Sequence, residues 1–111
     1  MKMFFTVFLV LNFLAEALAA VSLISANTGP WSTHYGFAVI AIASASLWVW
    51  PHRTSRRVVT AVLGILMTFH VALLCSLALE GTQLGGIVLH AVLALMAIAL
   101  FLLRGRWCNE P

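Results

Sequence analysis

Four long apolar segments, separated by short polar connections, constrain this chain more than any other feature of its sequence. The segments cover residues 3–25, 34–50, 58–79 and 84–103. A helix needs about 20 apolar residues to cross the roughly 30 Å of hydrocarbon in a bilayer. Only 8% of the residues are charged, whereas about a quarter are charged in a soluble domain. The sequence therefore predicts an all-α integral membrane protein with four transmembrane helices.

The connections between the segments carry residues that end helices. An Asn-Thr-Gly-Pro sequence at 27–30 ends the first segment, Pro51 follows the second, and Glu-Gly-Thr-Gln at 80–83 separates the third from the fourth. Short connections favour antiparallel neighbours. We therefore expect a four-helix antiparallel bundle that forms a single domain over residues 1–111.

The basic residues give the expected orientation. They lie before the first segment, in the middle connection and after the last segment: Lys2, Arg53, Arg56, Arg57, Arg104 and Arg106. With four crossings these positions share one side, which the positive-inside rule makes cytoplasmic. We therefore expect a multi-pass protein of the cell membrane with both termini in the cytoplasm. Because the basic residues form short runs between apolar stretches, we do not expect a nucleic-acid partner.

The start of the chain is open to a second interpretation. Met1 and Lys2, the apolar run and the Ala17-Leu18-Ala19 sequence are also typical of a signal peptide. The apolar run continues to Ile24, and cleavage would leave three helices with one terminus outside. We therefore interpret residues 3–25 as a transmembrane helix.

Three ionisable residues stand out deep inside the predicted helices, where such groups are costly and often functional. Counting along each helix at ~1.5 Å per residue, Glu16 lies about 21 Å from Lys2. His70 and His90 lie at about 20 and 21 Å from the basic residues of their own helices. The sequence therefore predicts one layer that contains Glu16, His70 and His90.

The helical faces extend this layer. Asn12 precedes Glu16 by four residues, so the two share a face. Small residues flank the second histidine on one stripe: Gly86, His90, Ala94 and Ala97. On the third segment, Thr60, Gly64, Thr68 and Cys75 form a ridge. His70 points roughly opposite Thr68, and we expect it to face inward because Thr tolerates lipid better than His.

The first functional hypothesis is a proton-linked carrier or a small-ligand site that uses Asn12, Glu16, His70 and His90. Such a layer can exchange a proton for a cation or a polar head group. Four short helices enclose little volume, so a pathway favours a homodimer. The structural alternative is that these polar groups only hydrogen-bond between or along the helices.

Length, four spans and the Leu14-Ala15-Glu16 triplet resemble the small multidrug resistance transporters. In that family a glutamate at the corresponding place binds protons and cationic drugs. The third segment here lacks the family's aromatic and glycine-rich pattern, and histidines within the spans are foreign to it. The four-span DoxX-like proteins are similar in architecture alone. We adopt neither family.

Two further hypotheses remain. His70 and His90 on adjacent helices at matched depth could bind a haem b iron from both faces, or share a metal ion with Glu16. Alternatively, the chain is an accessory or assembly subunit that packs into a larger membrane complex through its small-residue faces. An enzyme is the least favoured class, because the sequence has no nucleophile–base pair and no metal motif.

Overall fold

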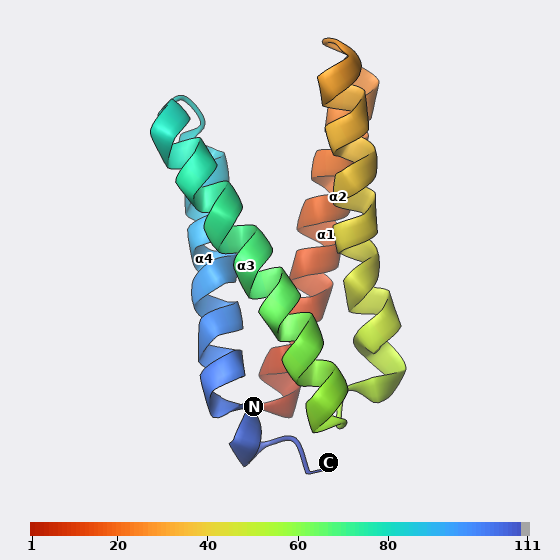
Figure 1. Ribbon diagram of the computed structural model, residues 1–111, viewed down its shortest axis with the longest axis vertical. Coiled ribbons are helices and arrows are strands. Elements are labelled where there is room, and N and C mark those ends of the chain that lie inside the picture. Colours follow the sequence, from red (N-terminus) through yellow and green to blue (C-terminus); the bar gives the residue numbers. More distant parts are fainter. Residues whose placement is uncertain (110–111) are drawn as a thin grey trace. The chain divides into compact units, whose positions relative to one another are not determined.

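The computed structural model describes residues 1–109, and within that range it contains helices and no strands. The long helices are α1 (Lys2–Ala26), α2 (Pro30–Val49), α3 (Arg56–Glu80) and α4 (Leu84–Leu103) (Figure 1). Two short 3-10 helices, η1 (Trp50–His52) and η2 (Arg104–Arg106), follow α2 and α4. All four long helices have the length and apolar composition needed to cross a membrane. The predicted all-α class with four long apolar helices is confirmed, and these helices are consistent with a four-helix bundle.

The helix boundaries differ from the predicted ones mainly at α2, which begins at Pro30 rather than at residue 34. Proline suits the first turn of a helix, because its φ is already helical and its missing N–H would have had no partner there. Gly29 stands before it with a φ of 146°, and Asn27 has a φ of 45°. These positive φ angles let the chain reverse between α1 and α2, and asparagine is one of the few residues that tolerate them.

The turn between α3 and α4 depends on Gly81. Its φ of 73° lies in the left-handed region, which glycine enters without a steric penalty. Its N–H donates to the carbonyl oxygen of Leu77 at 2.9 Å, which satisfies one of the free carbonyls at the end of α3. Three residues then suffice to start α4 in the opposite direction. The predicted turn at 80–83 is therefore confirmed.

The internal contacts divide the chain into two compact units, and the division falls inside α1. The α3–α4 unit contains residues 1–8 and 52–109, and the α1–α2 unit contains residues 9–51. The single domain expected from the sequence stays a prediction.

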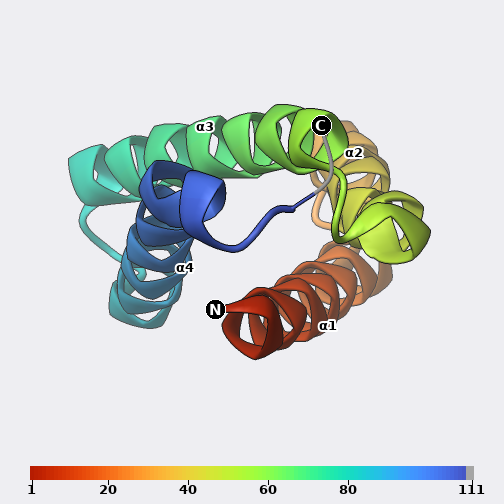
Figure 2. The ribbon, with the colours of Figure 1, turned by 90° about the horizontal axis from the view of Figure 1, so that it is seen from below.

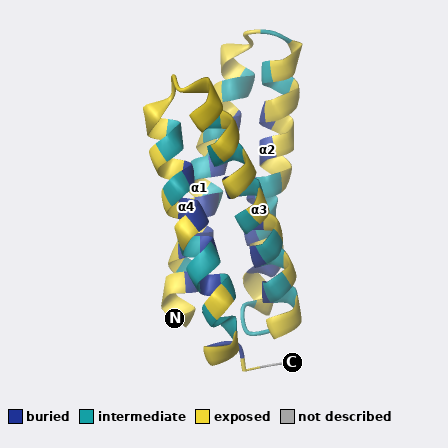
Figure 3. Ribbon diagram, turned by 60° about the vertical axis from the view of Figure 1, so that its left-hand side comes forward, coloured by how far each residue is buried: buried dark blue, intermediate teal, exposed yellow. Residues whose placement is uncertain are grey.

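In the α3–α4 unit the two long helices run side by side in opposite directions (Figures 1 and 2). Their buried residues recur at helical spacing: Val59, Leu63, Leu66 and His70 on α3, and His90, Leu93, Ala94, Ala97 and Leu100 on α4. Each set forms one face of its helix, as a packed helix pair requires. The end that contains the turn, residues 78–85, is exposed (Figure 3).

In the α1–α2 unit the two helices approach each other closely at Gly36 of α2. A Cβ atom at this position would lie 2.6 Å from Cγ1 of Ile24 and 3.1 Å from the carbonyl oxygen of Ala20. The absence of a side chain therefore lets the backbones come together, as is common between membrane helices. Nearby, the Ser32 hydroxyl donates to the carbonyl oxygen of Leu23 at 2.6 Å.

Candidate functional site: a buried histidine pair

The α3–α4 unit brings two of the predicted site residues into direct contact. His70 and His90 are separated by 20 residues, and their Nδ1 atoms lie 3.0 Å apart. Their side chains are 0% and 7% exposed, respectively. At this distance one imidazole donates its Nδ1–H and the other accepts with a bare Nδ1, so the two rings have opposite roles. The pair is a buried hydrogen bond that joins the two helices.

The helical faces explain why these two histidines meet. His70 continues the buried face of α3, four residues after Leu66, while Thr68 and Cys75 are exposed on other faces. His90 begins the buried face of α4, where Ala94 and Ala97 follow it. Alanines at these positions let α4 approach α3 closely. The structure therefore places His70 inward, as the sequence led us to expect.

An aromatic ring borders the pair. The ring centroid of Phe69 lies 5.2 Å from that of His70 and 6.2 Å from that of His90, edge-on in both cases. The two imidazole rings themselves are tilted by 35°, with centroids 5.3 Å apart. Edge-on contacts of this kind add to the energy of simple burial and fix the ring orientations. Phe69, which the sequence analysis did not single out, therefore belongs to the surroundings of the site.

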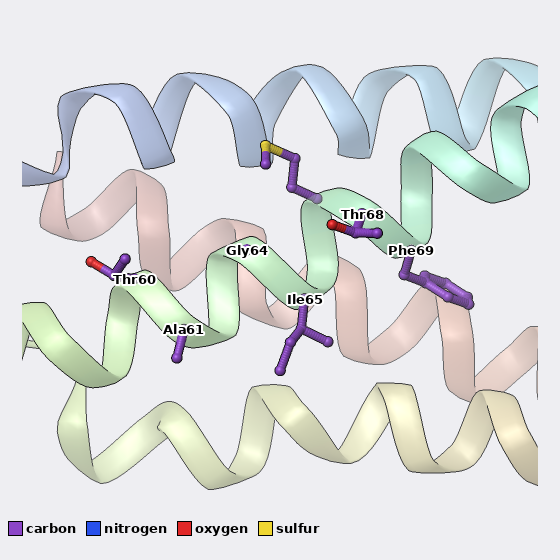
Figure 4. Close-up of a pocket in the computed structure, with 7 residues that line it drawn as sticks. Thr60, Ala61, Gly64, Ile65, Thr68 and Phe69 are labelled. Atoms are coloured by element: carbon purple, nitrogen blue, oxygen red, sulfur yellow. The ribbon is translucent and has the colours of Figure 1, made fainter.

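A hollow on α3 shares this aromatic residue (Figure 4). It is lined by Thr60, Ala61, Gly64, Ile65, Met67, Thr68 and Phe69, all from one stretch of α3. A Cβ atom at Gly64 would meet nothing within 4 Å. The hollow therefore contains three members of the ridge predicted from the sequence, and Phe69 connects it with the histidine pair.

The other two predicted site residues lie in the α1–α2 unit. The Asn12 side-chain amide donates to the Ser46 hydroxyl at 3.0 Å, and both side chains are buried. Glu16 follows one turn later on α1 and is also buried. Ser46 was missed in the sequence analysis, because a single serine in an apolar helix can equally bond back to its own backbone. The predicted layer of Glu16 with both histidines stays a prediction.

The geometry of the pair bears on the haem and metal hypotheses. A metal–imidazole bond is about 2 Å long, so two histidines on opposite sides of a haem iron need nitrogens about 4 Å apart with a porphyrin between them. The observed 3.0 Å leaves no room for a haem between these two nitrogens. A tetrahedral ion would need about 3.3 Å, but zinc sites in proteins use at least three protein ligands. Two histidines alone therefore do not make a metal site, and a contribution from Glu16 stays a prediction.

Comparison of the chain with known protein families, with curated proteins and with solved structures finds no match.

Proposed function

We propose that this protein is a small proton-linked carrier of the membrane, in which His70 and His90 bind and release the coupling proton. The observation that carries the proposal is the buried contact between their Nδ1 atoms at 3.0 Å. Histidine is the side chain whose ordinary titration range covers physiological pH. Ionisable residues within a membrane helix commonly mark proton or ion pathways.

The pair can couple a proton to a movement of the helices. When both rings are neutral, one donor faces one acceptor. A proton on the bare Nε2 of the donating ring leaves this hydrogen bond in place. A further proton on the accepting Nδ1 turns that atom into a donor, so the hydrogen bond is lost and one or both rings must turn away. Because His70 belongs to α3 and His90 belongs to α4, this change alters the contact between the two helices. Two arrangements of one contact, selected by a proton, are what a coupled carrier requires.

The hollow on α3 is the proposed place for the carried molecule. Phe69 lines the hollow and lies against both imidazole rings. A change in the positions of the two imidazole rings would therefore be transmitted to the hollow by the Phe69 side chain. The threonine hydroxyls of Thr60 and Thr68 supply polar groups there, and Thr60 already accepts a hydrogen bond from Nε of Arg104.

The proposed setting is the cell membrane, with both termini in the cytoplasm. Large apolar side chains are exposed on these helices: Trp31 is 85% exposed and Leu79 is 90% exposed. Exposed large apolar side chains occur on all four long helices, which is unusual for a protein in water and suits contact with lipid. The positions of the six basic residues support the orientation.

The test uses purified protein in lipid vesicles with a pH-sensitive dye inside and an imposed cation gradient outside. Sodium, potassium and tetramethylammonium are the probe cations. We expect a proton flux that depends on one of them and is lost in His70→Gln and in His90→Gln. His34→Gln and His52→Gln are the matched controls, because both residues are exposed at helix ends. Unchanged flux in the His70 and His90 variants would refute the proposal. Glu16→Gln tests the carboxyl group of the α1–α2 unit in the same assay.

A second candidate, an accessory subunit of a larger membrane complex, is favoured by the open space at Gly64. The Thr60, Gly64 and Thr68 ridge has the small-residue spacing at which membrane helices pack closely. A partner helix would fill the same hollow. Gly64→Leu distinguishes the two candidates: loss of a co-purifying protein would indicate a subunit, and loss of flux without a partner would indicate a carrier.

A further inference from the structure

Three basic side chains converge at one end of the α3–α4 unit. Burial raises the pKa of the Cys108 thiol, while the positive charges of Arg56, Lys2 and Arg104 act on it in the opposite direction. These charges come from the start of α3, the start of α1 and the end of α4. Three separate parts of the chain therefore place a cation near the same sulfur atom.

Contacts hold two of these side chains in place. Nε of Arg104 donates to the Thr60 hydroxyl at 3.0 Å, its Nη1 donates to the carbonyl oxygen of Phe101, and its guanidinium lies 4.0 Å from the centre of the Phe101 ring. The Arg56 side chain lies beside Gly105, where a Cβ atom would be 3.4 Å from Nη2 of Arg56. A guanidinium has five N–H groups, so Arg104 has donors left for a further acceptor.

Among residues 1–109, the acidic side chains are those of Glu16 and Glu80. Glu80 ends α3 at the far end from Arg56, about 36 Å away along the helix. Glu16 is fourteen residues further along the chain than Lys2. Glu80 is too far away to neutralise the cluster, so within the described part of the α3–α4 unit three cations share this end without an acidic partner.

A buried donor lies beside the cluster as well. Trp107 is 4% exposed, and its indole N–H has no acceptor among the described residues. The ring of Phe5 packs against it at 4.9 Å, and its backbone N–H donates to the carbonyl oxygen of Arg104. A buried N–H without an acceptor is costly, and residues 1–109 supply no partner for this one.

We propose that this end of the α3–α4 unit binds the phosphate of an anionic phospholipid head group through Lys2, Arg56 and Arg104. Arginine and phosphate form paired, charge-assisted hydrogen bonds. The basic residues lie immediately beyond apolar helix: Arg104 follows Leu103, and Trp107 follows η2. Tryptophan is enriched at the level of lipid head groups, and the cytoplasmic leaflet is the anionic one. The inference depends on membrane insertion of the helices and not on the histidine pair.

The experiment is native mass spectrometry of the protein released from vesicles that contain equal amounts of phosphatidylcholine and phosphatidylglycerol. We expect the protein to retain phosphatidylglycerol in preference to phosphatidylcholine. Arg56→Gln together with Arg104→Gln should lower this retention by about tenfold, because charge-assisted hydrogen bonds are lost. The matched control is Arg57→Gln together with Arg106→Gln, which removes the same charge from exposed neighbours and should change retention less than twofold.

Two further variants keep the result clear if the double substitution impairs folding. Arg56→Lys preserves the positive charge but not the planar guanidinium. Trp107→Phe preserves an aromatic ring but not the indole N–H. Both variants should weaken the retention of phosphatidylglycerol in folded protein. Equal retention of the two lipids would overturn the proposal, as would equal effects of the test and control pairs. Retention of inorganic phosphate with no preference between the two lipids would also overturn it and would assign the site to free phosphate.

Discussion

His70 on α3 and His90 on α4 form a buried hydrogen bond, with their Nδ1 atoms 3.0 Å apart. The contact joins the two helices four residues after Leu66 and three residues before Leu93, where the buried face of α3 ends and that of α4 begins. A neutral pair of this kind holds the helices together, and protonation of the accepting Nδ1 removes the bond. The same two residues therefore account for the packing of the α3–α4 unit and for its proposed response to protons.

We expect the histidines to stabilise the protein as a coupled pair. His70→Leu and His90→Leu should each lower the free energy of unfolding by about 1–2 kcal/mol, since each leaves a buried imidazole without its partner. The double variant should be less destabilised than the sum, with a coupling energy of about 0.5–1.5 kcal/mol. Unfolding in mixed micelles, followed by circular dichroism, measures these values. Additive effects would mean that the two rings do not interact in the folded protein.

The two glycines Gly36 and Gly64 should respond differently to substitution by alanine. Gly36→Ala should destabilise the protein by about 1–3 kcal/mol, because the new Cβ would lie 2.6 Å from Cγ1 of Ile24. Gly64→Ala should have little effect or be slightly stabilising, since that Cβ would meet nothing within 4 Å. Thermal unfolding in detergent compares the two variants. The close approach would be disproved if Gly36→Ala matched Gly64→Ala.

Adding Ile24→Ala to Gly36→Ala should recover part of the lost stability. The shorter side chain removes the closest contact, while the carbonyl oxygen of Ala20 at 3.1 Å remains. No recovery would indicate that the loss at Gly36 arises from the backbone contact alone.

The Cys108 thiol should be alkylated slowly at neutral pH. Burial raises its pKa above the ordinary value for cysteine, so less thiolate is present, and the rate should continue to rise at higher pH than for a free thiol. The measurement is the rate of iodoacetamide labelling in a Cys75→Ala background, with protein unfolded in detergent as the control. Arg56→Gln removes a nearby positive charge that favours the thiolate, so it should slow the labelling further. A native rate equal to the unfolded rate at neutral pH would contradict the burial.

Fusions should report both termini in the cytoplasm. In a bacterial host, green fluorescent protein attached after Pro111 should fluoresce, and alkaline phosphatase at the same place should be inactive. Replacing Arg53, Arg56 and Arg57 with glutamine should weaken this preference, because these residues supply half of the six positive charges that set it. Active phosphatase at the C-terminus of the unchanged chain would mean an odd number of crossings or the opposite orientation.

The positions of the helices were largely predictable from the sequence. Long apolar runs with breakers between them require helices in any solvent without hydrogen-bonding capacity, since only a helix satisfies its own backbone. The main error was the start of α2, because residues 31–33 are too polar for an apolar window but extend a helix that Pro30 begins. Gly81 was correctly predicted in a turn, since few other residues adopt its φ of 73°.

The site was only partly predictable. Counting residues from the basic residues at the helix ends placed His70 and His90 at matched depths. Helical periodicity predicted that His70 faces inward. Neither argument could identify Ser46 as the partner of Asn12 or Phe69 as the ring beside the histidines. Those contacts depend on the rotation of each helix about its own axis. The sequence does not determine this rotation, because apolar residues occur on all sides of each helix.

The sequence by itself determined the number of helices and their approximate bounds. It also determined at which helix ends the basic residues lie. These follow from local properties, namely hydropathy, breakers and charge. The tertiary structure decided which side chains meet: His70 with His90, Asn12 with Ser46, and Arg104 with Thr60. Such pairings arise from packing between helices, where small residues such as Gly36 and Ala94 set how closely two backbones approach. No local pattern contains that distance, so the histidine pair became a defined site only when α3 was packed against α4.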